Sequence, residues 1–124
     1  AAAPDPSFAP DMTVERFMRA SNQRDFDTMA SLFGTREGSV TAQWSEREVD
    51  ERMLIFANVL RHQDYSIAGE EIVPGRRDEA TQLTVRIVLQ NGNTVMVPFT
   101  VVRTERDASW LVESFALDVL TRAR

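Results

Sequence analysis

Residues 83–101 read LTVRIVLQNGNTVMVPFTV, and this stretch decides the fold. Apolar and polar side chains alternate on either side of Gln90-Asn91-Gly92, as in two antiparallel strands joined by a tight turn. A two-residue Asn-Gly turn would put Leu83, Val85, Ile87 and Leu89 on the same face as a half-polar row, which consists of Met96, Pro98 and Thr100. A three-residue loop with Gly92 in the left-handed conformation would instead align two apolar rows. We predict this second register, which puts on one face Leu83, Val85, Ile87, Leu89, Val95, Val97, Phe99 and Val101.

Turn signals on both sides of this hairpin extend it to four strands. Pro74-Gly75 fits a type II turn, and residues 106–109 mark a further reversal. We expect antiparallel strands at about 64–73, 79–90, 94–104 and 109–118. The chain before residue 64 has helical periodicity, so the sequence predicts an α+β domain in which three N-terminal helices pack on a curved four-stranded antiparallel sheet.

The helical half has recognisable start and stop signals. Thr13 is expected to cap a first helix that ends near Asn22. Asp25 is expected to cap a second, which Gly34 would stop in a left-handed conformation. Residues 35–43 are polar and contain small residues, and we interpret them as a loop or a short edge hairpin that could act as a pocket lid.

A third helix should begin at Ser45, because Ser45 and Glu48 have the spacing of a capping box. Trp44 precedes this cap and Val49 lies at the fourth helical position, the arrangement of a hydrophobic staple. We therefore interpret Trp44 as structural, with ligand stacking as the alternative. The apolar stripe of this helix is broad, so we expect it to be buried on more than one side; its members are Val49, Met53, Leu54, Ile55, Phe56, Ala57, Val59 and Leu60.

Composition excludes several functional classes. The 124 residues contain no Cys and one His, which rules out disulfides, thiolate chemistry and a multi-histidine metal site within one chain. The net charge of −5 opposes binding to nucleic acid. Phosphate-binding loops and nucleophile elbows are missing, so no cofactor and no metal are expected. No apolar run approaches the roughly 18 residues of a transmembrane segment.

Residues 1–10, AAAPDPSFAP, hold three of the five prolines and lack apolar periodicity. This composition indicates a flexible tether before a single domain at residues 11–124. Tethers of this kind separate a domain from an anchor, which favours the bacterial cell envelope or periplasm, with the cytoplasm as the remaining alternative.

Two segments resemble the nuclear transport factor 2-like (NTF2-like) superfamily. RDFDTMASLF at residues 24–33 is similar to its second helix, and SWLV at residues 109–112 is similar to its last strand. The order of elements over residues 11–120 agrees with that family. More narrowly, the chain resembles uncharacterised members that bacteria place behind a Pro- and Ala-containing tether, often as lipoproteins. The resemblance implies a cystatin-like cone, with a cavity between the sheet and the helices.

Some proteins of that superfamily carry out acid-base chemistry in the cavity, and four residues are the catalytic candidates here: Asp27, His62, Asp64 and Tyr65. Each also has a structural interpretation. Asp27 suits the positive end of a helix dipole, His62 lies near a helix C-terminus, Asp64 suits a turn and Tyr65 suits the inner face of a strand. Trp44 and Tyr65 are the candidate ligand-binding residues. A ketosteroid-isomerase-like site would need a carboxylate base opposite a hydrogen-bond donor, and no such pair stands out.

Two hypotheses follow. The first is a non-catalytic domain of the envelope that binds a protein partner or a small apolar ligand. The second is a small-molecule isomerase, dehydratase or cyclase. The outer sheet face is too apolar for solvent and predicts a homodimer, which the resemblance also implies; the interface candidates are Arg86, Val88, Met96, Pro98, Thr100 and Val102. Arg86 and Glu113 are expected to pair across this face.

Overall fold

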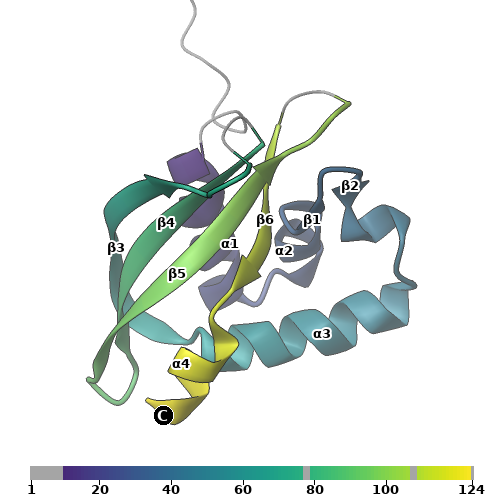
Figure 1. The fold of residues 1–124 in the computed structure, drawn as a ribbon. Coiled ribbons are helices and arrows are strands. Elements are labelled where there is room, and N and C mark those ends of the chain that lie inside the picture. Colours follow the sequence, from purple (N-terminus) through teal and green to yellow (C-terminus); the bar gives the residue numbers. More distant parts are fainter. Residues whose placement is uncertain (1–9, 77–78, 107–108, 124) are drawn as a thin grey trace, which may run out of the picture.

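The computed structural model describes residues 10–76, 79–106 and 109–123. It is an α+β fold in which helices lie behind a strongly twisted antiparallel sheet (Figure 1). The elements in chain order are α1 (Pro10–Gln23), α2 (Phe26–Ser31), β1 (Gly34–Thr35), β2 (Gly38–Ser39), the 3-10 helix η2 (Val40–Ala42), α3 (Glu46–Val59), β3 (His62–Ile72), β4 (Ala80–Leu89), β5 (Thr94–Arg103), β6 (Trp110–Phe115) and α4 (Leu117–Arg122).

The sheet has the order β3-β4-β5-β6, so each strand pairs with its neighbours in sequence. The predicted register of the central hairpin is confirmed. Val85 lies opposite Val97, and Leu83 lies opposite Phe99. Gly92 has a φ of 88°, and the Leu89 N–H donates to the Asn93 carbonyl at 2.8 Å, which closes the three-residue loop.

Two helix starts are also confirmed. The Asp25 carboxylate accepts the Thr28 N–H at 3.3 Å at the start of α2. The Ser45 hydroxyl accepts the Glu48 N–H at 3.2 Å at the start of α3. Residues 35–43 form the expected small hairpin, β1 with β2, followed by η2. The two helix starts were predictable because a capping side chain binds a backbone N–H only three residues further along the chain.

The predicted cap at Thr13 is wrong. Helix α1 begins at Pro10, a residue that is well suited to the first helical turn because its missing N–H has no helical partner there. Thr13 is buried inside the helix, and its hydroxyl donates to the Trp110 carbonyl of β6. Pro10 therefore belongs to α1 and not to the predicted tether. The other nine residues of the tether lie outside the described ranges.

Gly34 does not stop α2 in a left-handed conformation. The helix ends at Ser31, the N–H of the cap residue Leu32 bonds back into the last turn, and Gly34 begins β1. A Cβ at Gly34 would overlap the Gly38 carbonyl, so this position needs glycine because the two strands of the small hairpin approach so closely.

The core lies between the sheet and the helices. The apolar row of β4 and β5 is buried except at Val95, which is half-buried, and α1 packs on this row with Phe17 and Met18 fully buried. The middle of this space is occupied by the aromatic cluster, which we define as Phe17, Phe33, Trp44, Phe56, Phe99 and Phe115.

Helix α3 is buried on one side only. Val49, Met53 and Leu60 are buried, whereas Leu54 and Ile55 are 39% and 53% exposed. The expectation of burial on several sides is therefore wrong. A small helix, α4, follows β6 where a longer strand was expected. The Ala116 N–H still donates to the Pro98 carbonyl, but Pro98 has no N–H to donate in return, so the ladder with β5 ends there. No helix in the described ranges is long and apolar enough to cross a bilayer.

One end of the outer sheet face is covered by residues 73–76, which follow β3. Val73 packs there on a second small apolar cluster, which consists of Ala80, Val102 and Leu111. Arg76 from the same segment binds Glu113 of β6 through two hydrogen bonds of 2.8 and 3.1 Å. Glu113 therefore pairs with Arg76 and not, as predicted, with Arg86.

Candidate functional site

His62 and Tyr65 are the two catalytic candidates that the structure brings into contact. Both belong to β3, and their rings meet edge to face with centroids 5.3 Å apart. His62 is buried, and its Nδ1 lies 2.7 Å from the Leu60 carbonyl. The Tyr65 hydroxyl donates to the Glu15 carbonyl of α1 at 3.3 Å. The polar groups of both side chains therefore bond to backbone carbonyl groups of this chain.

Burial controls the protonation of both rings. Desolvation lowers the pKa of His62, although the Leu60 carbonyl and the Asp64 charge oppose this shift. Desolvation raises the pKa of Tyr65, and the nearby Glu15 carboxylate adds to the effect. Neutral imidazole and neutral phenol are thus the favoured forms at pH 7. Asp64 is exposed on the same strand.

The other two candidates lie apart from this pair. Asp27 is exposed in the first turn of α2, where dipole compensation accounts for it. Trp44 packs against Phe33 with ring centroids 6.2 Å apart, and the Arg52 guanidinium lies 4.5 Å above its ring. Both contacts are to side chains of this chain, which agrees with the structural interpretation of Trp44.

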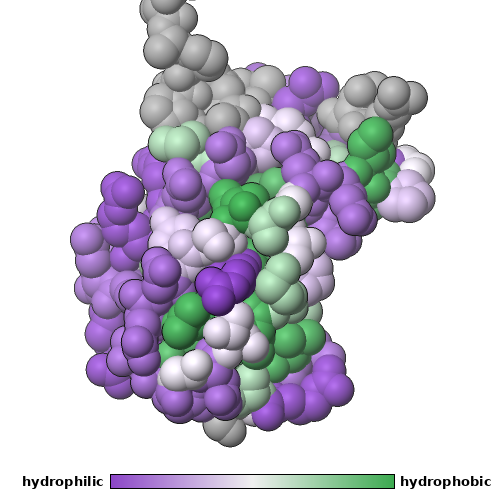
Figure 2. All heavy atoms as spheres, turned by 90° about the vertical axis from the view of Figure 1, so that its left-hand side faces the viewer, coloured by the Kyte–Doolittle hydropathy of each residue, from purple (hydrophilic) through white to green (hydrophobic). Residues whose placement is uncertain are grey.

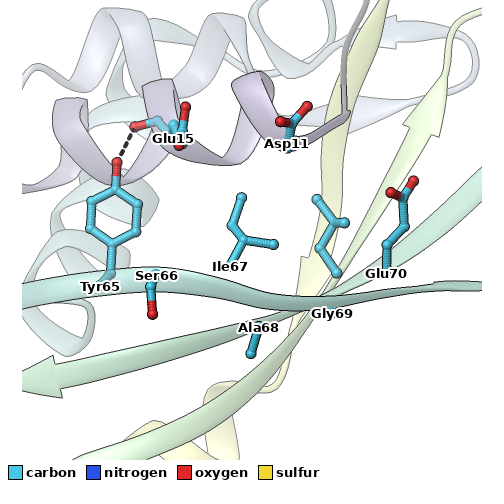
Figure 3. A pocket seen from close by; sticks show the side chains of 9 residues that line it. Asp11, Glu15, Tyr65, Ser66, Ile67, Ala68, Gly69 and Glu70 are labelled. Carbon is cyan, nitrogen blue, oxygen red and sulfur yellow. Dashed lines mark hydrogen bonds between the residues drawn. The ribbon is translucent and has the colours of Figure 1, made fainter.

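A groove between α1 and β3 was not apparent in the sequence. It has a volume of about 780 Å³ and is open to solvent. Figure 3 shows Asp11 and Glu15 on the helix side and Ile67 and Glu70 pointing up from the strand toward them, while Ser66 and Ala68 point away. The bond from Tyr65 to Glu15 bridges the groove at one end.

Acidic groups surround an apolar floor in this groove. Ile67 and Leu83 form the floor, and the carboxylates of Asp11, Glu15 and Glu70 line it. None of the three carboxylates forms an ion pair or a side-chain hydrogen bond with another residue in the described part of the chain. The residues come from α1, β3 and β4, and the helix is far from the two strands in the sequence, so only the alternation of β3, which places Ile67 on the inner face, could have suggested part of this set.

The outer sheet face carries the predicted interface residues. Met96 is 48% exposed, Arg86 is exposed, and Val88, Pro98 and Thr100 are half-buried. Val102 is fully buried in the small cluster on which Val73 packs, so the expectation that it is exposed is wrong. Figure 2 looks onto the β3 side, and its apolar residues gather in a band through the centre and right, whereas hydrophilic residues cover the left.

Within the described ranges no group of three or more Asp, Glu or His side chains is placed to hold a metal ion. No family model and no curated protein matches the chain. Among solved structures, it is similar to an NTF2-like transpeptidase from Campylobacter jejuni, with a TM-score of 0.59 and 15% identity, over 85% of this chain and 97% of that one. At this identity the likeness concerns the fold, and the chain therefore has an NTF2-like fold.

Proposed function

We propose that the chain is a non-catalytic binding or assembly domain, associated with the bacterial envelope, that works as a homodimer through its outer sheet face. The observation that supports it best is the aromatic cluster. Phe56 and Phe115 meet at 5.1 Å, and Phe99 stacks on Phe115 at 5.1 Å, in the space where related folds have a cavity. The rings occupy part of this space, which favours a protein partner over a small apolar ligand.

The competing enzyme hypothesis has one supporting observation, the contact between His62 and Tyr65. Their hydrogen bonds go to the carbonyls of Leu60 and Glu15, however, which leaves neither poised toward a substrate. The name of the Campylobacter jejuni protein suggests acyl transfer for this chain too. Such chemistry needs an activated nucleophile, but the chain has no Cys, and no described hydroxyl hydrogen-bonds to His62.

The outer face has the features of a moderately polar dimer interface. Met96 and Val88 provide apolar area on adjacent strands. Arg86 lies directly opposite Met96, and its side chain forms no ion pair or hydrogen bond with another described residue. Around a two-fold axis Arg86 can meet an acidic group of the second copy, which would fix the register of the two sheets. The composition of residues 1–10 supports the envelope location.

Sedimentation at tens of micromolar tests the dimer. We expect the unmodified chain to sediment as a dimer and Met96→Glu as a monomer, because the new charge would be buried without a partner. Ile55→Glu is the matched control, since Ile55 is 53% exposed on α3, away from the sheet, and this variant should remain a dimer. A monomeric unmodified chain, or an intact Met96→Glu dimer, would contradict the proposal.

A thermal-shift screen with polycyclic apolar compounds tests the binding mode. Stabilisation by such a compound, lost in His62→Gln or Tyr65→Phe, would favour the enzyme over the binding domain. We expect no stabilisation, because the aromatic cluster occupies part of the interior.

A further inference from the structure

The groove between α1 and β3 lies along a free sheet edge. Strand β3 is the first in the order β3-β4-β5-β6 and, in the described part of the chain, pairs only with β4. An edge strand keeps alternate backbone N–H and C=O groups unpaired. The segment from Ser66 to Glu70 faces the groove and spans about 14 Å at roughly 3.4 Å per residue.

The groove is bounded so that an added chain would be guided along β3. The Tyr65–Glu15 bridge closes one end. Gly69 has no side chain, and no atom lies within 4 Å of the place where a Cβ would be, so another backbone can approach the strand there. Ala68 lies in a bulge between Ile67 and Gly69, which confines regular pairing to a short stretch.

Charge decides which segment fits. The carboxylates of Asp11, Glu15 and Glu70 carry no ion pair within the described residues, and Glu71 follows on the same strand. A second copy of β3 would bring Glu70 and Glu71 against like charges, which disfavours edge-to-edge self-pairing. The N-terminal segment of the chain is also unsuitable, because Asp5 is its only charged side chain.

We propose that this groove binds a basic, extended segment of a partner protein, which adds to the edge of β3 while its Lys or Arg side chains meet Asp11, Glu15 and Glu70. Binding by strand addition takes its affinity from main-chain hydrogen bonds and its specificity from the side-chain environment. Ile67, which is half-buried, would contact the aliphatic stems of the basic side chains. The proposal specifies a partner for the binding role above, but it does not depend on the dimer.

Fluorescence anisotropy with a labelled peptide of alternating Lys and Val tests this inference. We expect saturable binding at low salt, and a loss of at least about tenfold in affinity for Glu15→Gln with Glu70→Gln, because both changes remove a carboxylate that a Lys side chain of the peptide would meet. The control Glu46→Gln with Asp50→Asn changes the net charge equally on exposed positions of α3 and should bind within about twofold of the unmodified chain. Circular dichroism establishes that every variant is folded.

A second peptide, N-methylated at alternate backbone positions, separates strand addition from charge attraction alone. It keeps every charge but loses hydrogen-bond donors, and we expect at least about tenfold weaker binding. Equal affinity for both peptides, equal losses in the groove variant and its control, or no binding to the unmodified chain would overturn the inference. The peptide should bind Met96→Glu normally; a loss there would place it on the outer sheet face and would also overturn the inference, whatever the sedimentation result.

Discussion

Truncating Phe56 to Ala tests the packing of the interior most directly. The Phe56 ring lies 5.3 Å from Phe33 and 5.1 Å from Phe115, so it connects α3 to the start of β1 and to the end of β6. Removing it leaves both neighbours facing a void that the surrounding backbone can close only in part.

The magnitude follows from burial and ring contacts. A buried Phe→Ala change costs about 3–5 kcal/mol, and the two aromatic pairs contribute about 0.5–1.5 kcal/mol each beyond their area. Because Phe56 is only partly buried, we expect the lower end, a loss of about 3 kcal/mol. In a domain of this size the melting temperature should fall by roughly 10 °C.

Equilibrium unfolding in urea, followed by far-UV circular dichroism, measures the change. The midpoint should fall while the denaturant slope stays constant. Ile55→Ala is the control on the same helix, because Ile55 is 53% exposed, and its free energy of unfolding should change by no more than about 0.5 kcal/mol. If Phe56→Ala costs less than about 1 kcal/mol, the aromatic cluster does not carry the packing assigned to it.

Three further predictions concern single contacts. Ser45→Ala should lower the free energy of unfolding by about 1 kcal/mol in the same assay, and no change would mean that another residue caps α3. Burial lowers the pKa of His62, so protonation favours the unfolded chain: stability should be constant above about pH 6.5 and fall as the pH drops below it, and His62→Gln should remove this slope. Glu113→Gln should cost about 1 kcal/mol by weakening the two-bond pair with Arg76, and the loss should shrink at high salt; equal losses at low and high salt would argue against an ionic contribution.

The sequence determined most of the fold because its strongest signals are local. Asp25 and Ser45 cap helices over three residues, and Gly92 fixes a hairpin register over ten. Parity then assigns every side chain of β4 and β5 to a face. The wrong prediction at Thr13 also rested on a local pattern. Its position suits a helix cap, but its hydroxyl donates to the Trp110 carbonyl, 97 residues away.

The candidate site could be predicted only in part. His62 and Tyr65 are three residues apart in β3, where regular alternation would put them on opposite faces of the strand. The bulge between His62 and Asp64, which the sequence did not reveal, allows their rings to meet. The groove and the burial of Val102 could not be predicted, because they depend on how α1 and residues 73–76 pack against the sheet. Such placements depend on tertiary packing, on which a single sequence carries no direct signal.

The bonds between the first helices and the last strand have a consequence for the order of folding. The Thr13 hydroxyl binds the Trp110 carbonyl, and the Val112 N–H donates to the Leu32 carbonyl at 2.7 Å. The hairpins of the sheet can form from neighbouring segments, but α1 and α2 gain these partners only when β6 has been synthesised. During translation α1 and α2 therefore lack these partners until residues 110–112 have left the ribosome, and aggregation competes with folding in this interval.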